Sequence, residues 1–336
     1  MTMALKTGKL PPELLEKLLK HRGAPDRRVV LGPSLGEDAA VVKLGKERLV
    51  LKTDPVTYAS DLIGWYAVNV NANDVVTRGA KPAWFQAAIL LPPGTEEELV
   101  ERIFKQISDA CKGLGIAVTG GHTEVTPGID HPIVVGDMHG ILGKRKLVRT
   151  SGARAGDALV MTKSAGIEGT AAIARERREE LLRLFDKELV DAAANYLFKP
   201  GLSIVREAMA ALDFGVSAMH DPTEGGVAMG VQEIAMASGK SVELHVDDII
   251  VRKETKIICQ KYGLNPLGLL GSGALLATFR PSKADEFASE VHKMGMDAAV
   301  VGRIVAGAGK SVAISGGEVT PLSSSERDEV LKVLGP

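Results

Sequence analysis

Short apolar runs of strand length alternate with longer helical segments in both halves of this chain, and this alternation most constrains its fold. In the first half we expect strands at 39–42, 49–51, 84–91, 116–119 and from 133 onward, with helices at 61–79 and 96–112. The string PPGTEEEL predicts a capped start for the second of these helices. The second half repeats the alternation from 158 to 304, and its expected helices include 179–197 and 202–212. Mixed strands and helices predict layered α/β or α+β structure. Because 336 residues exceed what one compact core usually holds, we expect two domains.

A polar, glycine-rich segment separates the two halves. The string SGARAGD at residues 151–157 follows a basic stretch that contains Lys144, Arg145, Lys146 and Arg149. Such a composition suits a crossing between domains. We therefore predict an N-terminal domain over residues 1–152 and a C-terminal domain over residues 153–336.

The composition excludes several classes of function. Lys and Arg total 41 against 42 Asp and Glu, so no electrostatic argument favours a nucleic-acid or anionic-lipid partner. The two cysteines, Cys111 and Cys259, stand in no CxxC or Cys/His cluster, which predicts buried, inert thiols. No apolar stretch reaches about 18 residues, and the N-terminus lacks a signal-peptide core. We expect no membrane partner and a cytoplasmic location.

Carboxylates beside glycines recur at the ends of predicted strands. They are Glu37 and Asp38 in GPSLGEDAAVV, Asp54 in LVLKTDPV, Glu124 in GGHTEV and Asp221 in HDPTEGG. Asp74 adds a carboxylate from the predicted helix 61–79, with Asn71 three residues earlier on the same face. Magnesium that bridges a polyphosphate requires hard oxygen ligands of this kind, and glycines let backbone N–H groups approach phosphates. The set indicates nucleotide chemistry.

Each of these carboxylates has a structural alternative. Asp38 could bond the amides of its own turn. Asp74 could pair with Arg78 on a solvated helix face. Asp221 could mark only a helix start, with Thr223 as the N-cap.

Other signals are weaker. His122 and His220 could each be a structural imidazole. The string GSG at 271–273 is too short to indicate more than a turn. The chain has no GxxxxGK[ST] P-loop and no GxGxxG after a strand, so the commonest nucleotide-binding folds are not indicated.

Six motifs in a fixed order resemble the PurM-like, AIR synthase-related superfamily. They are GEDAAVV (36–42), LKTDP (51–55), NDVVTRGAKP (73–82), GGHTEV (120–125), RTSGARAGDALVMT (149–162) and HDPTEGGVAMGVQEIAMASG (220–239). This superfamily includes aminoimidazole ribonucleotide synthetase, selenophosphate synthetase, thiamine-monophosphate kinase and the hydrogenase expression/formation protein HypE, a carbamoyl dehydratase. The resemblance spans roughly residues 30–305, and NDVVTRGAKP with DPTEGG is most similar to the carbamoyl-dehydratase branch.

The resemblance implies a two-domain fold, a homodimer and an ATP- and Mg²⁺-dependent reaction. The N-terminal mixed sheet would form a barrel that spans the dimer, beside a C-terminal α/β domain. By match of motif, the implied metal ligands are Asp38, Asp54, Asp74 and Glu124. The implied catalytic residues, near the transferred phosphate, are Asp54 and Asp221. The implied nucleotide contacts are Gly36, Lys52, Asn71, Gly120, Gly121, Gly225 and Gly226.

Three departures from the family pattern limit what the resemblance implies. Where relatives often have an acid in GG[DE]T this chain has His122, a poorer magnesium ligand than a carboxylate. Where relatives have Arg after DPT this chain has Glu224. The dehydratase branch carries a C-terminal cysteine, whereas this sequence ends DEVLKVLGP. We therefore expect no thiocarboxamide dehydration on the protein's own tail.

Two functions stay open from the sequence. The first is a HypE-like enzyme that transfers the γ-phosphate of ATP to an oxygen of an unidentified small-molecule or carboxamide-type substrate, by kinase or by cyclo-ligase chemistry. The second is a non-catalytic, ATP-binding dimeric scaffold or sensor in metallocentre maturation or metabolic regulation. The departures at His122 and Glu224 and the lack of the branch's terminal cysteine motivate the second.

Overall fold

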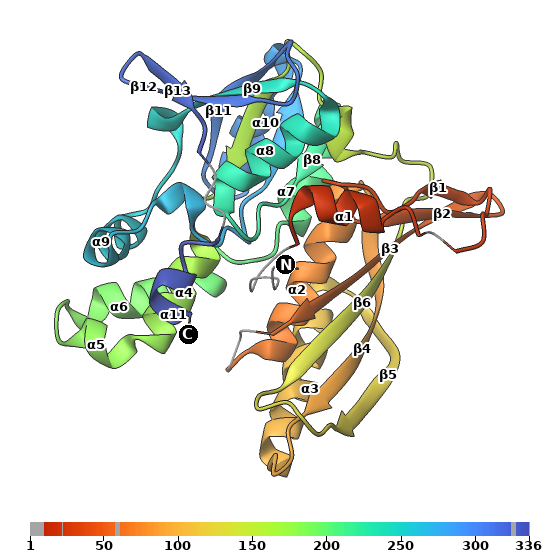
Figure 1. Ribbon diagram of the computed structural model, residues 1–336, viewed down its shortest axis with the longest axis vertical. Helices are drawn as coiled ribbons and strands as arrows, with labels where there is room; N and C mark the ends of the chain where they lie inside the picture. The colour runs from red at the N-terminus through yellow and green to blue at the C-terminus, as the bar shows by residue number, and fades with distance from the viewer. Residues whose placement is uncertain (1–9, 22, 58–60, 324–326, 336) are drawn as a thin grey trace, which may run out of the picture.

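The chain folds into two mixed sheets, each covered by helices (Figure 1). The structure is a computed structural model, and it describes residues 10–21, 23–57, 61–323 and 327–335. It confirms the predicted α/β class with two sheets. The first sheet ends with Ile141 and the second begins with Ala158. The predicted division at 152/153 falls in this interval and stays a prediction.

The first sheet has six strands in the order β1-β2-β3-β6-β4-β5 and is antiparallel except for the parallel pair β4 and β5. With β1 and β5 at its edges, the sheet formed by the described residues does not close into a barrel within one chain. Its strands are β1 (Val29–Leu31), β2 (Ala40–Leu44), β3 (Glu47–Val56), β4 (Lys81–Leu91), β5 (Ala117–Val125) and β6 (Ile133–Ile141).

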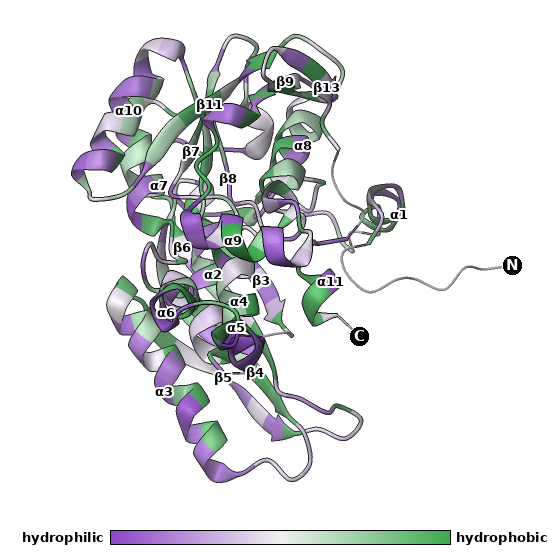
Figure 2. Ribbon diagram, turned by 90° about the vertical axis from the view of Figure 1, so that its left-hand side faces the viewer, coloured by the Kyte–Doolittle hydropathy of each residue, from purple (hydrophilic) through white to green (hydrophobic). Residues whose placement is uncertain are grey.

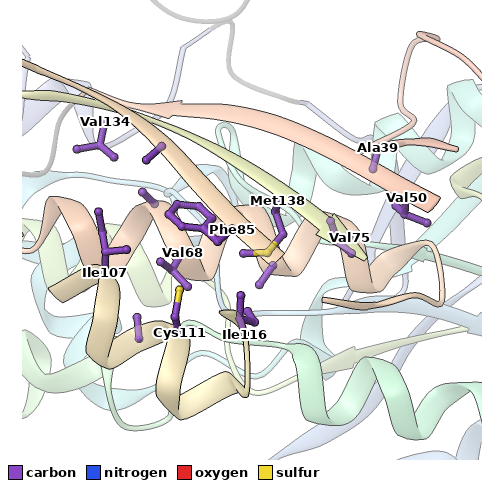
Figure 3. Close-up of a cluster of buried hydrophobic side chains, with 14 of the residues drawn as sticks. Ala39, Val50, Val68, Val75, Phe85, Ile107, Cys111, Ile116, Val134 and Met138 are labelled. Atoms are coloured by element: carbon purple, nitrogen blue, oxygen red, sulfur yellow. The ribbon is translucent and has the colours of Figure 1, made fainter. Parts of the chain in front are cut away.

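Three helices belong to this half: α1 (Pro12–Leu18), α2 (Ile63–Thr77) and α3 (Glu97–Leu114). Helix α2 lies between the sheet and α3 and is buried on nearly every face. Figure 3 shows Val68 and Val75 of α2 beside Phe85 and Met138 of the sheet. Because α2 is enclosed, tertiary packing stabilises a helix that its own valines and asparagines favour poorly.

The second sheet has seven strands in the order β13-β12-β9-β11-β7-β10-β8. Helix α8 packs on one face, while α7 and α10 pack on the other, and Figure 2 shows α8 and α10 on opposite sides of the strands. The strands are β7 (Ala158–Thr162), β8 (Ala218–His220), β9 (Ser241–His245), β10 (Leu276–Phe279), β11 (Ala298–Val305), β12 (Ser311–Ser315) and β13 (Glu318–Pro321). The two helix layers are formed by α7 (Val205–Ala211), α8 (Gly226–Ser238) and α10 (Pro281–Lys293).

The remaining helices gather in a separate apolar cluster. They are α4 (Ile167–Glu176), α5 (Arg178–Leu182), α6 (Lys187–Ala194), α9 (Lys253–Tyr262) and α11 (Leu331–Leu334). Among the helices that the structure describes, none has both the length and the apolar character needed to cross a bilayer.

Some predicted element boundaries are wrong, and each has a local reason. The single helix expected over 179–197 is broken into α5 and α6, because the Asp186 side chain accepts the Leu189 amide and starts a new helix. The strand expected at 116–119 continues through GGHTEV as β5. The expected cap in PPGTEEEL is absent: Glu96 precedes α3 without a side-chain cap, and the Thr95 hydroxyl donates to the Pro92 carbonyl instead.

Asn73 of α2 joins the two halves of the chain. Its Nδ2 donates to the Leu202 carbonyl at 3.0 Å, and its Oδ1 accepts the Ile204 amide at 2.9 Å. These bonds hold residues 202–204 out of the helix expected over 202–212, so that α7 begins only at Val205. Asn73 is fully buried. The contact fixes α2, the helix that carries Asp74, against the second half.

We predict that Asn73→Ala lowers the free energy of unfolding by about 2–4 kcal/mol, because it leaves the Leu202 carbonyl and the Ile204 amide buried without partners. Asn69→Ala is the matched control: Asn69 is also buried in α2, but among the described residues its Nδ2 bonds only the Trp65 carbonyl of the same helix. Urea unfolding of both variants measures the difference. Equal losses of stability would contradict the role given to Asn73.

Candidate functional site

A fully buried arginine lies at the junction of the two halves. Arg78, directly after α2, contacts the Glu37 carboxylate, and it donates to Asp38 Oδ2 at 2.8 Å and to the Met219 carbonyl at 3.0 Å. It also donates to the Thr150 hydroxyl at 2.8 Å. A buried guanidinium is tolerated only with such partners. Arg78 therefore holds the loop before β2, the interdomain crossing and β8 in one place.

Asp38 sits at the centre of this junction. Besides Arg78, its Oδ2 accepts the Thr77 hydroxyl at 3.0 Å, while its Oδ1 lies 2.8 Å from His220 Nδ1. Burial alone would raise the pKa of Asp38, but His220 and Arg78 lower it below the usual value. Asp38 is therefore held as a carboxylate. It contacts three side chains from two other segments, the end of α2 and the end of β8, so the alternative of a simple turn residue is wrong.

Lys52 brings two more of the predicted carboxylates together. Lys52 and Asp54 share one face of β3, because strand side chains alternate. The Lys52 ammonium lies 2.9 Å from Asp74 Oδ2 on α2 and 3.7 Å from Asp54 Oδ2. The alternative pairing of Asp74 with Arg78 is therefore wrong. The side chain of Asp54 is 36% exposed, whereas that of Asp74 is only 7% exposed. Solvent therefore reaches this pair of carboxylates from the side of Asp54.

The pKa values of Lys52 and Asp74 depend on the charges of their neighbours in this group. Burial raises the pKa of Asp74, Lys52 opposes that rise, and nearby Asp38 and Asp54 add to it. Burial alone would lower the pKa of Lys52, but Asp74 and Asp54 raise it above the usual value. Lys52 is thus a fixed cation among carboxylates that repel one another. The predicted convergence of Asp38, Asp54 and Asp74 is present in the structure.

His220 and Asp221 bring the second half of the chain to the same place. His220 ends β8, and its Nε2 lies 2.7 Å from Glu233 Oε2 on α8. Burial alone would lower the pKa of His220, but Asp38 and Glu233 raise it well above the usual value. Asp221 follows directly and is 2% exposed; burial, with Asp74 and Asp38 nearby, raises its pKa. The alternative that Thr223 caps a helix here is wrong, because Gly225 precedes α8 without a side-chain cap.

Two other predicted contacts line this junction. Asn71 of α2 donates from Nδ2 to the Ala67 carbonyl at 2.8 Å and to the Asp54 carbonyl at 3.3 Å. Gly36 has a φ of +73°, and a Cβ there would lie 3.1 Å from the Glu233 carbonyl oxygen. Glycine therefore permits the loop that carries Asp38 to approach α8 closely.

The predicted phosphate-binding amides at the start of α8 are engaged within the chain. The Gly225 amide donates to Asp328 Oδ2 at 2.7 Å, and the Gly226 amide donates to the Thr223 carbonyl at 3.0 Å. Asp328 also accepts the amide of Leu270. A phosphate at these amides would have to displace the Asp328 carboxylate. No local sequence signal indicates this contact, because 103 positions separate Asp328 from Gly225.

Three predicted site residues lie apart from the carboxylates in one chain. Gly120, Gly121 and Glu124 belong to β5, the exposed edge strand. In register, Gly121 is separated from Asp54 by the two intervening strands β4 and β6, or about 14 Å at three strand spacings. Glu124 instead contacts His122 Nε2 at 3.1 Å and accepts the Thr126 hydroxyl at 2.8 Å. The expectation that Glu124 joins Asp38 and Asp74 is wrong for a single chain.

A second acidic group, which the sequence did not single out, lies near Gly225. Burial raises the pKa of Glu168 to about 7, a hydrogen bond with Ser272 opposes the rise, and Asp328 and Glu224 add to it. Burial also raises the pKa of Asp328 to about 6, against the amides that it accepts. Glu224, the departure from Arg after DPT, therefore adds negative charge to an already acidic place.

The two cysteines are buried, as predicted. Burial raises the pKa of Cys111 to about 11 and that of Cys259 to about 12. Neither thiol is thus ionised near neutral pH.

Two family models match consecutive parts of the chain. A family model described as the N-terminal domain of AIR synthase related proteins matches residues 36–142, and the corresponding C-terminal domain matches residues 154–315. A putative hydrogenase expression/formation protein of Methanocaldococcus jannaschii is 27% identical over 307 residues, with 88% of each chain covered. The carbamoyl dehydratase HypE of Rhizobium leguminosarum bv. viciae is 28% identical over 281 residues, which cover 81% of this chain and 77% of HypE.

A solved structure shares the fold. The hydrogenase maturation protein HypE in complex with ATP superposes with a TM-score of 0.73 at 24% identity, covering 89% of this chain and 92% of that one. The likeness confirms the predicted PurM-like two-domain fold.

The raised pKa of Glu168 predicts a pH-dependent effect of its replacement. The carboxyl keeps its proton to about pH 7 when folded, against 4.5 as the usual value, so the folded state binds more protons between these limits. Stability therefore falls as the pH rises from about 4.5 to 7. We predict that Glu168→Gln is more stable than the parent protein by about 1–3 kcal/mol at pH 8, and that the gain disappears at pH 4.

Thermal unfolding of both proteins across this range measures the gain. Glu290→Gln on the exposed surface of α10 is the control, for which no pH-dependent gain is expected. A gain for Glu168→Gln that is the same at pH 4 and pH 8 would contradict the protonated state of Glu168.

Proposed function

Because the chain belongs to the family of AIR synthase related proteins, we propose that it is an ATP- and Mg²⁺-dependent enzyme that transfers the γ-phosphate of ATP to an oxygen of a small-molecule or carboxamide-type substrate. One observation carries the proposal: Asp38, Asp54 and Asp74 meet around Lys52 at the junction of the two halves. Their approach to one another requires the three segments that contain the family motifs GEDAAVV, LKTDP and NDVVTRGAKP.

The donor set fits a magnesium–nucleotide complex. Magnesium is usually held by one or two carboxylates, with waters and phosphate oxygens completing its shell. Asp54 and Asp74 would supply these carboxylates, and the Lys52 ammonium, which lies between them, would contact phosphate oxygens. When bound, Mg²⁺ neutralises charge on the triphosphate and orients the γ-phosphate.

The chain's own residues would position and shield the reacting groups. Asp221 would face the transferred phosphate from the second half, and burial of Asp74 and Asp221 would keep water out of that side of the site. Arg78 keeps Asp38 ionised and in place without facing the nucleotide, since all of its described contacts lie within the junction. Catalysis of this kind depends on positioning and charge neutralisation.

Calorimetry tests the nucleotide site. We predict that the protein binds ATP in the presence of Mg²⁺, and that Asp54→Asn and Asp74→Asn each weaken this binding at least tenfold, because each removes one carboxylate from the ion. Asp109→Asn, on the exposed face of α3, is the matched control and should bind as the parent protein does. Absence of Mg²⁺-dependent ATP binding in the parent protein, or unchanged binding in both site variants, would refute the proposal.

A second function, a nucleotide-binding scaffold or sensor, is favoured by the contact of Asp328 with the Gly225 amide. That carboxylate occupies an amide that phosphate would use. A screen for metabolites that stabilise the protein in the presence of a non-hydrolysable ATP analogue would identify acceptors. With an acceptor present, Asp54→Asn and Asp74→Asn abolish release of ADP in an enzyme, whereas a sensor releases none even in its parent form.

A homodimer is part of the proposal, and β5 is the surface that supports it. All nine residues of this edge strand are exposed, including Val118 and Val125. A long, exposed edge strand gains stability by pairing with another chain.

We predict a dimer at micromolar concentration in sedimentation velocity, and a monomer for the double variant Val118→Lys, Val125→Lys, because two charges on each strand edge repel across the pair. Val319→Lys is the control: Val319 is also exposed but lies on β13, at the edge of the other sheet. A monomeric parent protein would count against the dimer.

A further inference from the structure

Basic side chains gather at one end of the first sheet. The segments 43–48 and 144–146 together contain six Lys or Arg residues and one acidic residue, Glu47. The pairing of β3 with both β2 and β6 brings these segments together. The Leu142 amide donates to the Arg48 carbonyl at 3.0 Å, and the Arg48 guanidinium donates to the Arg145 carbonyl at 2.6 Å. We call this group the basic patch; it consists of Lys43, Lys46, Arg48, Lys144, Arg145 and Lys146.

The charges of the basic patch are not compensated within the described part of the chain. None of its six cations forms an ion pair there, whereas exposed cations elsewhere do, such as Lys105 beside Asp109. Lys43 lies directly opposite Arg48 in the register of β2 and β3, and like charges in such a position destabilise a pair of strands. The whole chain has a net charge of −1, so the patch is a local excess of positive charge. A partner with negative charge would offset this repulsion.

An apolar cavity adjoins the basic patch. It has a volume of about 510 Å³ and lies between residues 145–148 and residues 209–216, which form the end of α7 and the turn after it. Arg145 and Lys146 belong both to the patch and to the cavity wall, and Asp213 is the one carboxylate among the described lining residues. The apolar part of the wall consists of Val148, Met209, Ala210, Leu212 and Val216. The cavity thus offers an apolar surface directly beside two cations.

The patch and the cavity together favour one kind of partner. The cations extend over the neighbouring strands β2, β3 and β6, or about 10 Å at two strand spacings, which is wider than a single phosphate or carboxylate group. Single-stranded nucleic acid usually stacks its bases on aromatic side chains, and none of the described residues that line the cavity is aromatic. An acidic segment of another protein can place several carboxylates on the patch and an aliphatic side chain in the cavity.

We propose that the basic patch and the adjoining cavity bind an acidic segment of a partner protein, with an aliphatic side chain of that segment in the cavity. The patch shares no residue with the group of Lys52, Asp54 and Asp74, so this binding does not depend on the proposed reaction. Attraction between the charges speeds association and weakens as salt screens it. The contact in the cavity distinguishes an acidic segment that contains aliphatic residues from one that does not.

Fluorescence anisotropy on the full chain tests the proposal with three labelled peptides. The first is Glu-Glu-Leu-Glu-Glu-Leu-Glu-Glu, the second has serine in place of both leucines, and the third has glutamine in place of every glutamate. The first should bind one to each chain, the second at least fivefold more weakly because it leaves the cavity unfilled, and the third not measurably. No binding of the first peptide, equal binding of the first and second, or tighter binding of a single-stranded oligonucleotide of the same net charge would overturn the proposal.

Charge reversal assigns the binding to the patch. The triple variant of three exposed residues, Lys144→Glu, Arg145→Glu and Lys146→Glu, should bind the first peptide at least tenfold more weakly than the parent protein. The matched control makes the same change of charge on exposed residues of α9 and should bind as the parent does; it is Lys253→Glu, Lys256→Glu and Lys261→Glu. Equal binding by the two triple variants would also overturn the proposal.

Asp54→Asn separates this proposal from the proposed function. It should lose Mg²⁺-dependent ATP binding but keep the affinity of the parent protein for the first peptide. Because the comparison of the three peptides uses the parent protein, it remains decisive even where a variant does not fold.

Discussion

The buried guanidinium of Arg78 is the interaction on which the rest of the site depends. It contacts Glu37 and Asp38 from the loop before β2, the Thr150 hydroxyl in the interdomain crossing and the Met219 carbonyl of β8. A cation buried in this way requires all of its partners at once, since removal of one leaves an uncompensated charge. Docking of the two halves and ionisation of Asp38 are thus one event.

The acidic residues that this arrangement brings together would repel one another if no cations lay beside them. Lys52 offsets Asp54 and Asp74, and His220 offsets Asp38, while Asp221 is left beside like charges. Such a surplus of buried negative charge costs stability, and proteins retain it where a cation or a polyphosphate–metal complex binds. The same arrangement, which costs stability by itself, would favour binding of Mg²⁺–ATP.

The sequence predicts the fold class, most elements and the convergence of Asp38, Asp54 and Asp74, because strand periodicity and family motifs are local signals. The sequence does not predict contacts that form only when distant elements of the chain pack against one another. The Asp328 carboxylate reaches the Gly225 amide across about 100 positions, and His220 gains Glu233 only once α8 packs beside β8. The prediction for Glu124 is wrong for a related reason. The motif GGHTEV is part of the edge strand β5, which places Glu124 away from the other carboxylates.

The proposed function requires that the carboxylates beside Lys52 hold a divalent ion together with a triphosphate. Anomalous diffraction at the manganese edge, from crystals grown with Mn²⁺ and a non-hydrolysable ATP analogue, locates this ion. We expect an anomalous peak within about 2.5 Å of carboxylate oxygens of Asp54 and Asp74, with phosphate oxygens beside the Lys52 ammonium. A nucleotide bound elsewhere, or a peak that contacts neither aspartate, would contradict it.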